Sequence, residues 1–176
     1  ALQQPVVDVL SRTRAEESPE LQWARVALAA IKSGLGDLTG ALALQQQVLV
    51  VYERTLPNDR PELRMARTGL ATTLRELGQL HEALALQRQV VQGLAQTSKE
   101  DDPVLLNAHR EVALTVRRLG DLTGAQSLQE QVVRGFLRTL PPDHPDVLCA
   151  YQDLANTKGL LGDLQGALAL QQQLLD

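Results

Sequence analysis

The sequence repeats itself every 42 residues, and this period constrains the fold more than any other feature. The run at residues 35–45 reads Leu-Gly-Asp-Leu-Thr-Gly-Ala-Leu-Ala-Leu-Gln, and related runs start at residues 77, 119 and 161. Prolines follow the same step, at Pro19, Pro61, Pro103 and Pro145. Because two independent markers keep one period, we expect an array of similar units that bury their apolar faces by stacking.

These markers divide the chain into repeats at 19–60, 61–102 and 103–144, followed by an incomplete repeat at 145–176. Residues 1–18 are expected to hold the second helix of a preceding partial repeat and a turn. The sequence begins in mid-repeat and without a methionine, which predicts that it starts inside a longer protein. We expect the first helix to begin at about Pro5, because proline fits the first helical turn.

Each unit has the pattern of a helix hairpin. In the last unit, apolar residues follow Pro145 at helical spacing, and Asp143 is placed to accept hydrogen bonds from the free amides at the helix start. Gly162 is expected to end this first helix, and Asp163 is expected to cap the second. In complete units the second helix should reach about residue 56 or 140.

Small residues recur where the two helices of a hairpin must approach closely. A larger side chain at these positions would push the helices apart. The set comprises Ala29, Ala71, Ala113 and Ala155 in the first helices, and Ala41, Ala83, Ala125 and Ala167 in the second. Leu28, Leu70, Val112 and Leu154 are expected to fill the layer between neighbours. The predicted fold class is therefore an all-α solenoid of antiparallel helix hairpins.

Charge and apolar patterning exclude several classes of protein. The net charge of −4 argues against a general nucleic-acid binder, which would be basic. No apolar run approaches the roughly 18 residues of a membrane span. The single cysteine, Cys149, allows no internal disulfide and is expected to act as a small apolar residue. This cysteine usage fits a cytoplasmic location.

Nothing in the sequence indicates catalysis. His81, His109 and His144 occupy three different phases of the repeat, so we expect surface or capping roles and no metal site. The repeated glycines are helix ends, and the sequence contains no phosphate-binding loop motif. We find no nucleophile next to a base and predict neither an enzyme nor a cofactor.

The paired alanines and the Leu-Gly turn resemble the tetratricopeptide repeat, whose usual period is about 34 residues. The longer period and the turn at residues 140–145 resemble the kinesin light chain variant of that repeat. The sequence of residues 119–132 resembles that of bacterial repeat arrays that follow a signalling ATPase of the NB-ARC (STAND) type. This resemblance implies a right-handed superhelix that binds proteins. A HEAT-type solenoid is the alternative, since its period overlaps 42, but the tight turn and paired alanines favour the tetratricopeptide form.

In tetratricopeptide arrays the first helix of each hairpin lines a concave groove, which implies a set of candidate ligand-binding residues. These are Thr68, Thr72, Arg75, Asn107, Arg110, Arg117, Arg118, Gln152 and Asn156. Guanidinium groups suit carboxylate ligands, so we hypothesise that the groove holds an acidic segment of a partner or of the same protein. Alternatively, the arginines form a solvated face paired with Glu76 and Glu111.

Two functions follow from this pattern. The first is a protein- or peptide-binding scaffold, or a ligand-sensing domain of a larger, bacterial signalling protein, which does not bind nucleic acid or membranes. The second is a structural scaffold that assembles with itself. We expect an uncapped apolar face around Leu168, Leu170 and Leu174, through which copies of the chain could form a homo-oligomer.

Overall fold

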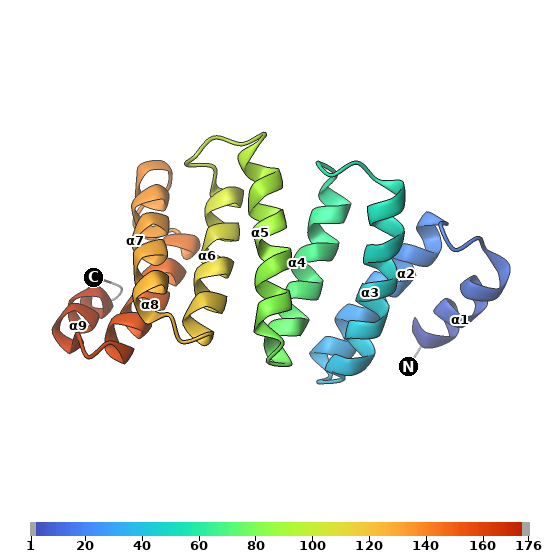
Figure 1. The fold of residues 1–176 in the computed structure, drawn as a ribbon, viewed down its shortest axis with the longest axis horizontal. Coiled ribbons are helices and arrows are strands. Elements are labelled where there is room, and N and C mark those ends of the chain that lie inside the picture. Colours follow the sequence, from blue (N-terminus) through green and yellow to red (C-terminus); the bar gives the residue numbers. More distant parts are fainter. Residues whose placement is uncertain (1–2, 174–176) are drawn as a thin grey trace. The chain divides into compact units, whose positions relative to one another are not determined.

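The structure is a computed structural model, and it describes residues 3–173 of the chain. This part contains nine α-helices and no β-strand (Figure 1). The helices are α1 (Gln3–Thr13), α2 (Pro19–Gly34), α3 (Leu38–Thr55), α4 (Pro61–Glu76), α5 (Leu80–Ala95), α6 (Pro103–Arg118), α7 (Leu122–Thr139), α8 (Pro145–Leu160) and α9 (Leu164–Gln172). The predicted all-α solenoid of helix hairpins is confirmed.

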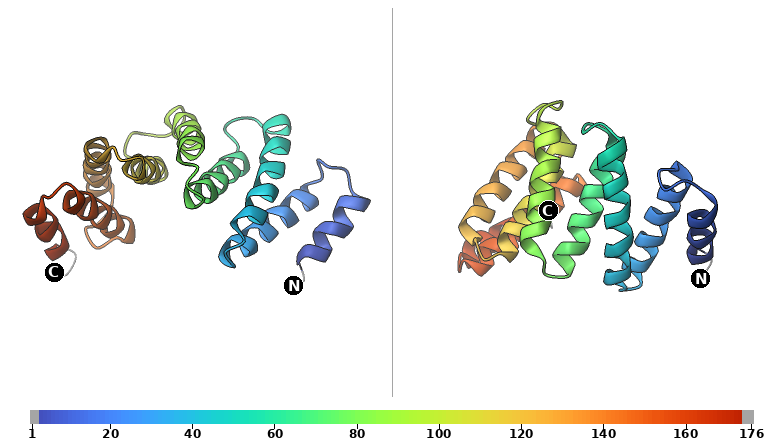
Figure 2. Two further views of the ribbon diagram at one scale, coloured as in Figure 1. Left: turned by 60° about the horizontal axis from the view of Figure 1, so that its bottom comes forward. Right: turned by 45° about the vertical axis from the view of Figure 1, so that its right-hand side comes forward.

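The helices form two compact units, residues 1–86 and 87–176, and α5 runs from the first unit into the second. In the first unit, α1 packs on α2, α2 on α3, and α3 on α4. In the second unit, α6 packs on α7, α7 on α8, and α8 on α9, while α6 also contacts α8. Figure 2 shows these hairpins from two further directions.

Each unit has an apolar core built from the inward faces of its helices. In the first unit, one cluster joins α1 to α2 through Val7, Leu21 and Leu28, and a second lies around Leu63 and Leu70. In the second unit, the larger cluster joins α6, α7 and α8 and contains Leu106, Val132, Phe136, Val147, Ala150 and Leu154. Burial of these side chains is the main favourable term for a repeat, since no hairpin can cover its own apolar face.

The turn inside each hairpin is set by a glycine and an acidic cap. Gly36, Gly78, Gly120 and Gly162 have φ between 79° and 94°, a left-handed conformation that glycine adopts without a Cβ clash. Asp163 then accepts a 2.9 Å hydrogen bond from the amide of Gly166 and caps α9. Both predictions for this turn are confirmed. The ends of α3 and α7, with C-caps at residues 56 and 140, also agree with the sequence.

The predictions for two helix starts are wrong. His144, not Asp143, is the N-cap of α8, and its Nδ1 accepts a 3.2 Å hydrogen bond from the amide of Asp146. The residue before a proline is held in an extended conformation, which aims its own side chain at the first turn. In addition, α1 begins at Gln3, so Pro5 lies inside the first turn. The amides there have no partner within the helix, and proline loses nothing by lacking one.

The alanines expected between helices are buried in all but one case. Those at 29, 41, 71, 83, 113, 125 and 155 are at most 2% exposed, whereas Ala167 on the last helix is only partly buried. Leu168 is exposed, as predicted, but Leu170 packs against the core of the second unit, so its predicted place on an uncapped face is wrong. Leu170 turns inward because it lies two residues, or about 200° of helix, from Leu168. Leu174 lies outside the described residues.

Candidate functional site

The exposed face of the first helix of each hairpin is the candidate site. In α6, Leu105, Val112 and Ala113 are buried, while Arg110 and Arg118 reach solvent. Positions three and four residues apart share one helix face, so the exposed residues of each first helix form a stripe. We call this stripe the groove face, because the resemblance described above implies that it lines a groove. It comprises residues 23, 26 and 30 of α2 and their equivalents at 42-residue steps.

Arg110 lies at the centre of the groove face of the second unit. Its Nε donates a 2.6 Å hydrogen bond to Oδ2 of Asp153 on α8, and the two side chains are 21% and 13% exposed. Burial disfavours the Arg110 charge, but the bond to Asp153 and the nearby carboxylates of Asp153 and Glu111 outweigh it and raise the pKa of Arg110. The carboxylate bonded to Arg110 is thus Asp153, which the sequence interpretation did not name as a partner.

Two further arginines end α6. Arg118 is exposed and Arg117 partly buried, and neither makes an ion pair within residues 3–173. Cations in the last helical turn interact favourably with the negative end of the helix dipole. Arg117 and Arg118 therefore lie at a favourable helix end and make no ion pair in the described residues. Asn107, one turn before Arg110, is partly buried.

The groove face of α8 is mostly polar and uncharged. The side-chain amide of Gln152 donates a 3.1 Å hydrogen bond to Oδ1 of Asn156. Cys149 is exposed on the same face. Apart from the ion-paired Asp153, this face offers a ligand hydrogen-bonding groups without net charge.

The predicted ligand-binding residues of the first unit offer fewer groups to a ligand than those of the second unit. The hydroxyl of Thr72 donates a 3.1 Å hydrogen bond to the carbonyl oxygen of Thr68, so it is already satisfied within its helix. Arg75 is partly buried and engaged in an interaction of its own. Neither threonine carries a charge that would select a ligand.

The set of ligand-binding residues predicted from the sequence left out the apolar part of the first unit's groove face. Trp23 is 74% exposed, Val26 and Ala30 are exposed beside it on α2, and Met65, at the equivalent position of α4, is 66% exposed. The signal was present in the sequence, because Trp23 precedes Met65 by one 42-residue period.

The three histidines lie in different surroundings. His81 is exposed, and His144 caps α8. His109 is half-buried in α6, and burial lowers the pKa of its imidazole. Among residues 3–173, no group of three or more His, Cys, Asp or Glu residues is arranged to hold a metal ion. None of the helices in that range is long and apolar enough to cross a membrane.

Comparison with solved structures gives close matches in architecture. A kinesin light chain with nearly identical TPR-like repeats from Podosopora anserina is 29% identical, with a TM-score of 0.85 over 98% of this chain and 82% of that chain. BtubC from P. vanneervenii is 14% identical, with a TM-score of 0.78 over 96% and 67%. A Rap protein in complex with Competence and Sporulation Factor is 13% identical, with a TM-score of 0.76 over 98% and 46%. At such low identities, the last two show the fold alone.

Comparison of the sequence itself identifies the family. No curated protein matches the chain. The family model for the tetratricopeptide repeat, however, matches residues 20–96 and 104–176, which together span most of the sequence. The repeat period, the buried alanines and the left-handed glycine of each hairpin turn agree with this match. The chain therefore belongs to the tetratricopeptide repeat family.

Proposed function

We propose that the chain is a peptide-binding module and that the groove face of its second unit holds an acidic segment. One observation carries this proposal. Asp153 occupies only Nε of Arg110, so Nη1 and Nη2 of the guanidinium make no hydrogen bond in the described part of the chain. An arginine oriented in this way can accept a ligand carboxylate with little further loss of side-chain freedom.

Arg117 and Arg118 extend the same positive surface toward the end of α6. On and beside the groove face, the second unit has Arg110, Arg117 and Arg118 against the carboxylates of Glu111 and Asp153. Such an arrangement favours anionic side chains, and the amide groups of Gln152 and Asn156 add hydrogen-bonding capacity nearby. That a Rap protein of the same fold binds a factor adds support for peptide recognition.

Replacement of Arg117 and Arg118 by glutamate tests this proposal. A fluorescein-labelled, glutamate-rich peptide should bind the unaltered chain, and its affinity, measured by fluorescence anisotropy, should fall about tenfold or more in the double variant. Arg134→Glu on α7 is a suitable control, because Arg134 is exposed on a second helix and makes no ion pair in the described residues. Equal affinities for all three proteins would refute the acidic-ligand proposal.

We further propose that the module is the ligand-sensing arm of a bacterial, cytoplasmic signalling protein. The sequence of residues 119–132 supports a signalling protein, because it resembles the sequences of repeat arrays that follow NB-ARC ATPases. The presence of a single cysteine supports a cytoplasmic location. The reading frame on both sides of the sequence is the test. A P-loop ATPase segment upstream would support a sensor arm, whereas further repeats alone would indicate a free-standing scaffold.

Self-assembly is a second candidate function, favoured by one observation. Leu164 and Leu168 on α9 are 70% and 54% exposed, whereas their equivalents Leu80 and Leu84 are partly or fully buried. Exposed leucines one turn apart can pack against a second copy. Light scattering over a range of concentrations should then show a rising mass that Leu164→Glu abolishes, and a monomer at all concentrations would exclude this function.

A further inference from the structure

Trp23 is the chain's single tryptophan, and it lies on the surface of the first unit. Its side chain is 74% exposed, although tryptophan is usually among the more buried residues. Val26, three residues later, is 44% exposed, and Ala30, seven residues later, is also exposed. These spacings place all three on one side of α2, where they form an apolar stripe.

The exposure of Trp23 does not result from the lack of a first helix before α2 in the described residues. In the second unit, α8 contacts the preceding first helix α6, and on α8 Thr157 is buried whereas Cys149 is exposed. The equivalents of these two residues in α2 are Ile31 and Trp23. A preceding helix would therefore cover Ile31, which is 44% exposed here, and would leave Trp23 open.

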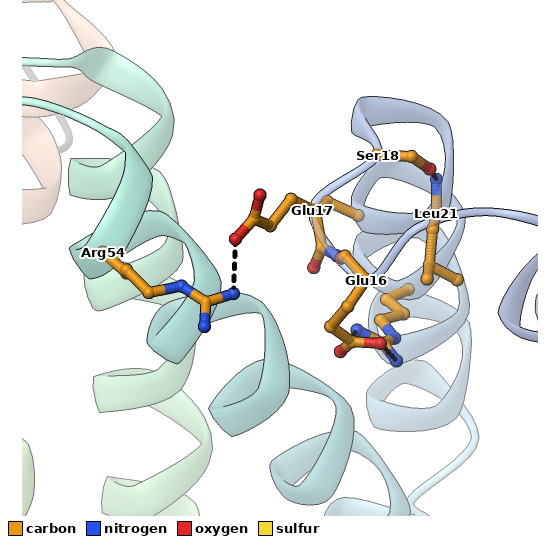
Figure 3. Close-up of polar contacts among 7 residues, drawn as sticks. Glu16, Glu17, Ser18, Leu21 and Arg54 are labelled. Carbon is orange, nitrogen blue, oxygen red and sulfur yellow. Dashed lines mark hydrogen bonds and ion pairs between the residues drawn. The ribbon is translucent and has the colours of Figure 1, made fainter.

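An acidic residue without an ion pair lies beside Trp23. The turn before α2 contains Glu16, which pairs with Arg25, and Glu17, which pairs with Arg54 at 2.8 Å (Figure 3). Glu20 is exposed and makes no ion pair within residues 3–173. It precedes Trp23 by three residues, so the carboxylate and the indole are neighbours on the helix surface.

No cation of α2 lies near this pair. The helix contains two, Arg25 and Lys32, which follow Trp23 by two and nine residues and so lie roughly 180–200° around the helix from it. Both are ion-paired, Arg25 with Glu16 and Lys32 with Asp37 at 2.6 Å. The surface around Trp23 thus combines an aromatic ring, small apolar side chains and the negative charge of Glu20, which has no ion pair in the described residues.

We propose that this surface binds a peptide segment in which an arginine or lysine stands next to an aliphatic residue. The cation would lie over the indole face of Trp23, where the ring quadrupole attracts it, and would pair with the carboxylate of Glu20. Val26 and Ala30 would cover the aliphatic neighbour or the stem of the basic side chain. This site shares the general peptide-binding function proposed above, but its residues and its ligand charge are different.

Two synthetic peptides of equal length test the proposal, one alternating leucine with arginine and the other alternating leucine with glutamate. Because Trp23 is the single tryptophan, its emission reports binding directly. The leucine–arginine peptide should change this emission in a saturable way, and the leucine–glutamate peptide should leave it unchanged. A saturable change with both peptides would overturn the cation specificity, and no change with either would overturn the site.

Substitutions then separate this site from nonspecific attraction. Glu20→Gln should weaken binding of the leucine–arginine peptide roughly fivefold, and Trp23→Ala should weaken it about tenfold or more, measured by anisotropy of the labelled peptide. Glu82→Gln is the matched control, since Glu82 is an exposed acid on α5 without an ion pair in the described chain. Equal affinities for the Glu20 and Glu82 variants would overturn the assignment, provided that circular dichroism shows both to be folded.

The same experiments distinguish this proposal from the acidic-ligand proposal for the second unit. Replacement of Arg117 and Arg118 by glutamate should affect the glutamate-rich probe and leave the leucine–arginine peptide bound at Trp23. If the acidic probe fails to bind and the basic peptide is sensitive to Glu20, only the acidic-ligand proposal falls. If the basic peptide binds without regard to Glu20 and Trp23, the present inference falls alone.

Discussion

The groove faces of α2 in the first unit and α6 in the second occupy the same repeat positions but differ in chemistry. Trp23 and Val26 stand in α2 where Asn107 and Arg110 stand in α6. Three residues after Val26 and Arg110, at the border of the exposed stripe, Ala29 and Ala113 are both buried. The repeat thus restricts the buried side, where a change of volume disturbs two helices, and leaves the exposed side free to diverge. If ligand recognition resides on the exposed side, the two units can select ligands of opposite charge.

The largest effect on stability is expected when a buried and an exposed aromatic residue are compared. Phe136 on α7 is fully buried in the second unit, so Phe136→Ala should lower the free energy of unfolding by about 3–5 kcal/mol. Trp23→Ala on the exposed face should change it by less than about 0.5 kcal/mol. Urea titration followed by circular dichroism would measure both, and a comparable loss for Trp23→Ala would show that Trp23 is structural.

Two glycines of the second unit test the same contrast between crowded and open positions with a smaller change of side chain. A Cβ at Gly135 on α7 would come within 2.5 Å of Leu106 Cδ2, so Gly135→Ala should destabilise the fold by about 1–3 kcal/mol. A Cβ at Gly159 on α8 would meet nothing within 4 Å. Gly159→Ala should therefore stabilise its helix by about 0.5–1 kcal/mol. The prediction fails if the two substitutions shift the urea midpoint in the same direction.

The Arg110–Asp153 pair is expected to have an intermediate effect. Asp153→Asn removes the charge that compensates a partly buried guanidinium, and we expect a loss of about 1–2 kcal/mol, between exposed and buried ion pairs. Asp143→Asn is the control, because Asp143 is exposed and has no ion pair in the described residues. In a double-mutant cycle with Arg110→Ala, the double variant should lose less stability than the sum of the two single losses, whereas additive losses would show that the two side chains do not stabilise each other.

The smallest expected effect concerns a feature that both units share. Lys32 pairs with Asp37 in the first unit, and Lys158 pairs with Asp163 at 2.8 Å in the second. The hydrogen bond from the lysine, together with a backbone amide of the capped helix, lowers the pKa of each aspartate. The contribution to stability is therefore present above the ordinary carboxyl pKa and is lost as the pH falls through the lowered value.

The matched substitutions are Asp37→Asn and Asp163→Asn. Asparagine can also cap a helix, so the change removes the ion pair and keeps the cap. Each variant should lower the thermal midpoint slightly at a pH of about 7 and should melt like the unaltered chain at a pH of about 2. Asp121→Asn should have less effect, since Val116 stands at the lysine position there. A constant difference between variant and unaltered chain across this range would contradict the assignment.

Much of the fold could be predicted from the sequence, because its elements depend on residues close together in the chain. A proline favours the first turn of a helix, a glycine permits a left-handed turn, and an aspartate caps the helix that follows. Gly162 and Asp163 were predicted in these roles for such local reasons, and the structure confirms them. The error at Asp143 is of the same local kind, since the extended residue before the proline provides the cap.

The candidate site was less predictable. The repeat phase, together with the family resemblance, indicated which residues share a face, but it did not indicate which carboxylate would meet Arg110. Asp153 is 43 residues away in the chain, and the two meet because α6 contacts α8. Similarly, the spacing of the sequence did not indicate that Glu16 and Glu17 would pair with Arg25 and Arg54 while Glu20 makes no ion pair in the described residues.

By itself, the sequence determined the period, the helix hairpins and the separation of each helix into a buried and an exposed side. These follow from backbone geometry and from the spacing of apolar residues, which act within one or two helical turns. The tertiary structure decided which charges are compensated and which remain available to a ligand. That outcome depends on how neighbouring helices are rotated and spaced, because an ion pair forms or fails to form over a difference of a few ångströms.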